Sequence, residues 1–120
     1  MRIHLNIEGA ALTATLDDTP PARDFAALLP LELSLDDYDA TEKIADLPRE
    51  LSSAGVPRGT AAAAGDVSYY APWGNLALFY ESAAHAVGLV RLGRFDALDE
   101  AIEVLRRPAP LHATIEIAET

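Results

Sequence analysis

The sequence predicts a mostly β protein: a small closed antiparallel β-barrel with two short helices. Apolar and polar residues alternate, as in half-buried strands, in segments spread along the whole chain. Only two segments have helical spacing, and proline ends both. The 120 residues, half of them hydrophobic, suit one packed domain over residues 1–120. A barrel is favoured because closure removes the exposed edges of a sheet.

The N-terminal segment predicts two successive strands. Ile3, Leu5 and Ile7 alternate with polar residues, which is the pattern of a strand with one buried face. A Gly9-Ala10 turn follows, and residues 12–16 continue a weaker alternation.

The first helix is expected directly after Thr19. Threonine is a common helix cap, and Pro20 and Pro21 suit the first helical turn. Apolar residues then follow at helical spacing: Phe25, Leu28 and Leu29. Pro30 ends the helix, and the alternation in residues 31–35 predicts a third strand.

The middle of the chain has weaker patterns. Residues 36–43 are expected to form a polar loop, in which Lys43 and its neighbour Glu42 supply a surface ion-pair element worth at most ~1 kcal/mol. Residues 46–51 are compatible with one helical turn. Glycine and proline recur over residues 55–65, which indicates a long loop.

Residues 65–81 form the most aromatic segment of the chain. They contain five of its eight aromatic residues: Tyr69, Tyr70, Trp73, Phe79 and Tyr80. Two strand-like runs joined by a Pro-Trp-Gly-Asn turn predict a β-hairpin with rings on both faces. One face can fill the barrel, and the other needs a cover. Core packing, a ligand or peptide groove, and a subunit interface are all open for it.

The C-terminal part predicts a strand, a helix and a last strand. Residues 82–85 are expected in a loop, and residues 87–95 in a strand. Asp96 is expected to cap the following helix, whose apolar stripe would be Leu98, Ile102 and Leu105. Alternation over residues 113–117 predicts the final strand.

Composition excludes several classes of partner. A net charge of -10 would repel phosphate backbones, so no nucleic acid is expected. No apolar run approaches the ~20 residues of a membrane-spanning helix, so no membrane partner is expected. The chain starts in an alternating pattern without an apolar signal segment and has no cysteine, which fits a cytoplasmic protein.

No cofactor and no metal site are expected. The acidic run Asp36-Asp37 and Asp39 lacks the central glycine and final glutamate of a calcium-binding loop. The three histidines have no ligand spacing, and without cysteine a structural zinc site is not expected. Residues 59–65 lack the Gly-Lys-Ser/Thr sequence of a phosphate-binding loop.

A set of short motifs occurs in a characteristic order: Glu42-Lys43-Ile44, Leu47-Pro48, Gly65-Asp66, Leu78-Phe79-Tyr80, Leu89-Val90-Arg91-Leu92-Gly93-Arg94 and Leu98-Asp99. In this order the chain resembles the cyclophilin-like fold, in particular small bacterial and archaeal cyclophilin-like proteins of unassigned function. The resemblance covers nearly the whole chain and implies the closed barrel.

The catalytic residues of the prolyl isomerases in that family are mostly missing here. The resemblance places Gly55, Ala63 and Leu89 where those enzymes have arginine, glutamine and histidine, and only Phe79 is kept. Isomerisation crosses an amide barrier of ~18–20 kcal/mol, and the arginine stabilises the twisted bond. Arg58 and Arg91 are the candidates to replace it.

Two function classes therefore lead. The first is a non-catalytic module that binds a small molecule or an extended peptide, with Tyr70, Phe79 and Arg91 as its wall and Trp73 at the hairpin turn. The alternative is a weak peptidyl-prolyl cis-trans isomerase that uses Arg91 or Arg58. A structural role as a homodimer is a third possibility.

Overall fold

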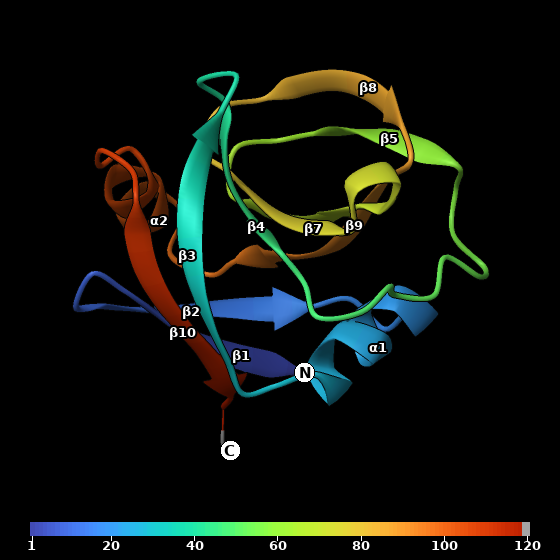
Figure 1. The fold of residues 1–120 in the computed structure, drawn as a ribbon, viewed down its shortest axis with the longest axis horizontal. Helices are drawn as coiled ribbons and strands as arrows, with labels where there is room; N and C mark the ends of the chain where they lie inside the picture. The colour runs from blue at the N-terminus through green and yellow to red at the C-terminus, as the bar shows by residue number, and fades with distance from the viewer. Residues whose placement is uncertain (119–120) are drawn as a thin grey trace.

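Eight antiparallel strands close into a barrel, which confirms the predicted fold class (Figure 1). The computed structural model describes residues 1–118. The barrel strands are β1 (Arg2–Ile7), β2 (Ala10–Leu16), β3 (Leu31–Tyr38), β4 (Glu42–Asp46), β6 (Asp66–Tyr70), β7 (Asn75–Phe79), β9 (Leu89–Phe95) and β10 (Leu111–Ile117). They are hydrogen-bonded in the order β1-β10-β3-β4-β7-β6-β9-β2.

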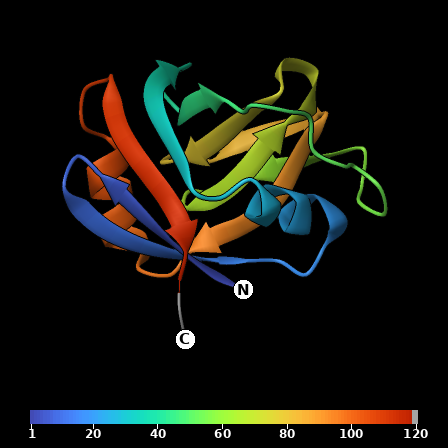
Figure 2. The same cartoon turned by 60° about the horizontal axis from the view of Figure 1, so that its bottom comes forward.

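Three further kinds of element complete the structure. A separate two-stranded sheet pairs β5 (Gly59–Ala62) with β8 (Ala83–Val87), and we call this pair the ribbon. The helices are α1 (Pro20–Ala27) and α2 (Leu98–Leu105), and one 3-10 turn, η1, spans Ala71–Trp73. Helices α1 and α2 lie on opposite sides of the barrel, and the start of β1 lies beside the end of β10 (Figure 2).

The terminal strands form as their alternation predicts. Strand β1 pairs with both β2 and β10, so Ile3, Leu5 and Ile7 all point into the barrel and are fully or almost fully buried. The inward residues of β2 and β10 pack against them. Local pattern and tertiary pairing agree here, because both strands have one buried and one solvated face.

Helix α1 begins as predicted, whereas α2 does not. The Thr19 hydroxyl accepts a hydrogen bond from the backbone N–H of Ala22 at 3.3 Å, which is a helix N-cap. For α2 the cap residue is Ala97, without a side-chain cap. The prediction that Asp96 caps this helix is wrong, because its carboxylate instead accepts a hydrogen bond from Thr15 at 2.6 Å.

The buried face of α2 also differs from the predicted stripe. The residues that α2 buries are Ala101, Val104 and Leu105. Leu98 is 36% exposed and Ile102 is only partly buried, so two of the three predicted stripe residues lie at the border of the interface. The helix is rotated toward the smaller alanine, which allows close approach to the barrel.

The middle of the chain contains more strand than its composition predicts. The polar segment expected as a loop over 36–43 is the end of β3 and the start of β4, with only a short turn between them. The helical turn expected over 46–51 is absent, since β4 includes Asp46 and the backbone N–H of Leu47 bonds to the carbonyl of Gly74. Ladder bonds between β3 and β4, and from β4 to β7, override the weak local preference.

The ribbon was not predicted as such. Residues 82–85, expected in a loop, contribute to β8, and the single strand expected over 87–95 is divided into β8 and β9. Gly88 makes the sharp turn between them with φ of 89°. A side chain there would lie 2.6 Å from the ring of Pro72, so glycine suits both the backbone and the space.

Two apolar clusters explain the two aromatic faces of the hairpin. Inward residues of β6 and β7, among them Tyr69 and Leu78, belong to the main core inside the barrel. The outward Phe79 packs with Ala62, Ala77 and Leu89 in a second cluster. That second cluster includes residues of the ribbon, which partly covers the outer wall of the barrel and so buries the outward apolar residues of the hairpin.

Lys43 is buried, contrary to the predicted surface ion pair with Glu42. It points inward from β4 and is 1% exposed, while its ammonium donates to the Asp37 carboxylate. The hydroxyl of Tyr80 donates to the same carboxylate at 2.9 Å, and the ammonium lies 5.1 Å from the centre of the Tyr80 ring. The hydrogen bond from Lys43 holds the pKa of Asp37 below its ordinary value. Burial and the Asp37 carboxylate raise the pKa of Tyr80 to about 12.

Candidate functional site

A cavity of about 280 Å³ lies between the outer wall of the barrel and the β8 side of the ribbon. Four aromatic rings line it, and we call it the aromatic cavity. Its lining residues are Tyr38, Asp39, Thr41, Glu42, Ile44, Tyr70, Trp73, Asn75, Phe79, Ala83, Ala84, Ala86 and Leu89. It contains three of the five predicted site residues: Tyr70, Trp73 and Phe79.

Strand register brings these side chains together. Tyr38 pairs with Glu42 between β3 and β4, and Glu42 pairs with Phe79 between β4 and β7, so the three form one row on the outer wall. Tyr70 pairs with Asn75 between β6 and β7 in a second row. Each row is a set of cross-strand neighbours whose Cβ atoms lie within about 5.5 Å of each other. The site is therefore set by rigid sheet geometry.

Trp73 is held at the mouth of the cavity by the turn that joins β6 and β7. Its ring meets the rings of Tyr38 and Tyr70 edge to face, with centroid distances of 5.1 Å and 5.3 Å and interplanar angles of 88° and 85°. Trp73 is 52% exposed and Tyr38 is 42% exposed, whereas Phe79 is buried at the base. An exposed ring cluster above a buried ring is the form of a binding pocket with an open entrance.

Asn75 and Glu42 place a hydrogen-bond acceptor and a carboxyl group in the lining of the aromatic cavity. Asn75 is 3% exposed, and its Oδ1 has no hydrogen-bond partner among the described residues. Burying such an oxygen without a donor costs about 1–3 kcal/mol. Glu42 is half-buried and accepts a hydrogen bond from the Thr41 hydroxyl at 3.2 Å. Burial raises the pKa of the Glu42 carboxyl above its ordinary value.

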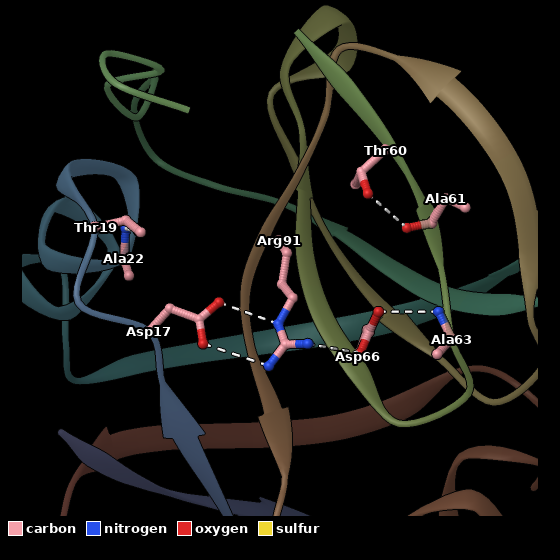
Figure 3. A network of polar contacts seen from close by, with 8 residues as sticks. All are labelled: Asp17, Thr19, Ala22, Thr60, Ala61, Ala63, Asp66 and Arg91. Atoms are coloured by element: carbon pink, nitrogen blue, oxygen red, sulfur yellow. Dashed lines mark hydrogen bonds and ion pairs between the residues drawn. The ribbon is translucent and has the colours of Figure 1, made fainter. Parts of the chain in front are cut away.

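Arg91 occupies a different cavity from the aromatic rings. This second cavity, of about 180 Å³, is lined by β9, the start of β5, the segment before β5, and residues 17 and 19. Leu89 is the one described residue that lines both cavities. The guanidinium donates to both oxygens of Asp17, at 3.0 Å and 3.4 Å, and lies 3.9 Å from Asp66 Oδ1 (Figure 3). Its charge is thus directed to two carboxylates of the chain itself.

Arg58 lies outside both cavities. Its side chain is exposed, and its backbone carbonyl accepts a hydrogen bond from Gly88 N–H at 2.7 Å. The structure therefore brings together the predicted rings Tyr70, Trp73 and Phe79, and places neither predicted arginine beside them.

Three contributors to the aromatic cavity escaped the sequence analysis: Tyr38, Glu42 and Asn75. Tyr38 and Glu42 stand in a segment that was predicted to be a loop, and Asn75 was assigned to a turn. Only the pairing register could have identified them, because the pairing of β4 with β7, which are distant in sequence, brings Tyr38 and Glu42 to the same cavity as Asn75.

Neither a metal nor a membrane span is indicated within residues 1–118. In that range no group of three or more histidine, aspartate or glutamate side chains could hold a metal ion. Likewise, none of the helices in this range is long and apolar enough to cross a bilayer.

The fold and the cavity define a class: a small antiparallel barrel flanked by two helices, with its ligand-sized hollow on the outer wall. A family model described as the cyclophilin-like family matches residues 5–116. The chain therefore belongs to the cyclophilin-like family, which confirms the resemblance seen in its motifs.

Comparison with solved structures supports the same fold. The solution structure of the hypothetical protein AF2241 from Archaeoglobus fulgidus is similar, with a TM-score of 0.65 and 20% sequence identity. The match covers 98% of this chain and 95% of that one. A search of curated proteins found no match to the chain.

Proposed function

We propose that this protein is a non-catalytic binding module whose ligand enters the aromatic cavity. The observation that carries the proposal is the unpartnered, buried oxygen of Asn75 in a hollow lined by Tyr70, Trp73 and Phe79. Aromatic surface supplies affinity, and a small number of polar groups fix orientation; this combination is common in small-molecule sites.

The size of the aromatic cavity favours a small ligand. Its volume of about 280 Å³ is close to the lower end of the ~300–1,000 Å³ range of ligand pockets. A small molecule, or one side chain of an extended peptide, matches that space. A long peptide would have to continue over the exposed rim formed by Trp73 and Tyr38.

Prolyl isomerisation is the alternative, and it depends on a free arginine next to the substrate. Arg91 is paired with Asp17 through two hydrogen bonds and lines a different cavity from Phe79. A protease-coupled assay on a prolyl tetrapeptide is expected to show no acceleration. Acceleration that Arg91→Ala abolishes would replace the binding proposal with the enzyme.

The binding proposal is tested by filling the cavity. Ala84 lines it from β8, and Ala84→Phe places a ring in the hollow. The matched control is Ala11→Phe, at an exposed strand position in β2. A fragment screen by amide NMR should give shifts at Tyr70, Trp73 and Phe79 and leave the β1 and β10 residues unchanged.

Fragments that bind the wild type and the Ala11→Phe control should fail to bind Ala84→Phe. If the same fragments bind both variants equally, the ligand does not use the aromatic cavity. If no fragment shifts the cavity residues, the module has no ligand there and the proposal fails.

A further inference from the structure

We infer that the ligand of the aromatic cavity is a small organic ammonium ion that carries at least one hydrogen-bond donor. This inference rests on the proposed binding function and adds the chemical class of the ligand. Three independent features of the cavity support it: its charge, its rings and its unpartnered acceptor.

The charge of the cavity lining has a single sign. Asp39 and Glu42 are the charged side chains among the lining residues, and none of those described residues is basic. Lys43 is next in sequence to Glu42, but it faces the barrel interior and donates to Asp37. An anion entering the cavity would therefore meet two carboxylates and no compensating cation, whereas an ammonium would be attracted.

The rings of the cavity suit a cation. Tyr38 and Tyr70 both stand nearly perpendicular to Trp73, with ring centres 5.1 Å and 5.3 Å away. Rings at right angles form a corner instead of a stack, so that their negative π faces are directed to more than one side. Tryptophan and tyrosine are the strongest side-chain partners for a cation, and such corners are used for ammonium groups.

The buried acceptor favours a ligand with a donor. Asn75 Oδ1 has no partner among the described residues, and Asn75 lines the cavity and pairs with Tyr70 in the strand register. An N–H of an ammonium would satisfy this oxygen with a charge-assisted hydrogen bond. The half-buried Glu42 carboxylate would be stabilised by the same positive charge, which counteracts the effect of its burial.

The test uses three probes of one length: n-butylammonium, n-butanol and n-butyrate. Trp73 is the single tryptophan of the chain and stands at the entrance, so its fluorescence reports occupancy directly. Butylammonium should bind about tenfold more tightly than butanol, and butyrate should not bind.

Two variants test the charge, and one serves as the control. Glu42→Gln and Asp39→Asn remove the two cavity charges with little change of shape, and asparagine tolerates the φ of 53° at position 39. Each should weaken butylammonium binding severalfold and change butanol binding much less, because butanol carries no charge. Glu116→Gln removes a charge from exposed β10, away from the cavity, and should leave both unchanged.

The outcomes separate the inference from the proposed function. If butanol binds as well as butylammonium, or if Glu42→Gln and Asp39→Asn leave the butylammonium affinity unchanged, the cation class is wrong while the binding function stands. If neither butylammonium nor butanol changes the fluorescence of Trp73, while the cavity-filling NMR screen still finds ligands, the class is again wrong. If that screen is also empty, both are overturned.

Discussion

The ion pair of Lys43 and Asp37, in which only the lysine is buried, predicts different losses of stability when one or the other member is replaced. Lys43 is 1% exposed, whereas the Asp37 side chain is 45% exposed. Asp37→Ala leaves an ammonium buried without its anion and removes the acceptor of the Tyr80 hydroxyl. Lys43→Met keeps the unbranched stem and removes the buried charge, and the remaining Asp37 carboxylate stays in contact with water.

The magnitudes follow from that difference in exposure. Breaking a fully buried pair by removing one partner costs roughly 3–5 kcal/mol. Because Asp37 is half exposed, water reaches this site, and we expect about 2–3 kcal/mol for Asp37→Ala. For Lys43→Met we expect less than about 1.5 kcal/mol, since a shape-conserving apolar replacement removes the desolvation penalty together with the pair.

Urea denaturation measures the loss of unfolding free energy in both variants. An unchanged slope of this free energy against urea concentration shows that only the stability has changed. Asp36→Ala is the matched control, because Asp36 is the exposed neighbour on the outer face of β3, and it should stay within about 0.5 kcal/mol of the wild type. A Lys43→Met protein that is destabilised as much as Asp37→Ala would refute the reasoning, because the buried charge would then contribute net stability.

Three further predictions concern the fold. Tyr69→Phe removes the acceptor of the Leu51 backbone N–H, 3.2 Å away, and should cost about 1–2 kcal/mol and speed hydrogen exchange at Leu51. Gly88→Ala combines a φ of 89° with a clash against the Pro72 ring, whereas Gly9→Ala has a φ of 82° and open space around it. In thermal melting the Gly88→Ala protein should therefore be the less stable of the two. Equal melting temperatures would show that the clash with Pro72 has no effect. Burial raises the pKa of Asp96, but hydrogen bonds from two threonines and an arginine bring it below its ordinary value. Asp96 should therefore stabilise the fold above pH ~4, near its unfolded pKa, and lose that contribution as the pH falls through its lower folded pKa. The difference in unfolding free energy between the wild type and Asp96→Asn should close in acid. A difference that stays constant with pH would contradict this prediction.

The parts of the fold that could be predicted are those where local pattern and tertiary contact agree. The strands at both chain ends have one buried and one solvated face, and the cap at Thr19 acts within its own helix. Strand β4 and the ribbon strand β8 were missed because their stability comes from partners distant in sequence. Lys43 was misplaced for another reason: the segment was predicted to be a loop, so neither its inward direction nor its pairing with Asp37 on β3 could be read from the sequence.

For the candidate site, too, the sequence predicted what local patterns determine and missed what depends on tertiary contacts. The density of rings in residues 65–81 indicated the right segment. Alternation predicted rings on both faces of the hairpin, and Tyr69 in the main core and Phe79 in the second cluster confirm it. Alternation also put Arg91 on the outward face with Leu89. It could not show that two cavities share that face with only Leu89 in common among the described residues, so that the rings belong to one cavity and Arg91 to the other.

The polar residues of the outer wall explain why a ligand is expected there at all. Asp66, Ser68 and Asn75 would normally face water on the outside of a barrel, yet they are 5%, 1% and 3% exposed. Oxygens of two of them, Asp66 and Asn75, have no hydrogen-bond partner among the described residues. Each such group costs about 1–3 kcal/mol when it is buried without a donor.

These two unpartnered oxygens differ in what stands near them. The Asp66 oxygen lies 3.9 Å from the Arg91 guanidinium, so a cation of the chain itself already offsets part of its burial. The cavity that Asn75 lines contains no basic side chain among the described residues. An apolar residue at position 75 would avoid the penalty. A donor from a ligand would also remove it, and the carboxylate and rings that line the same cavity favour a positively charged donor.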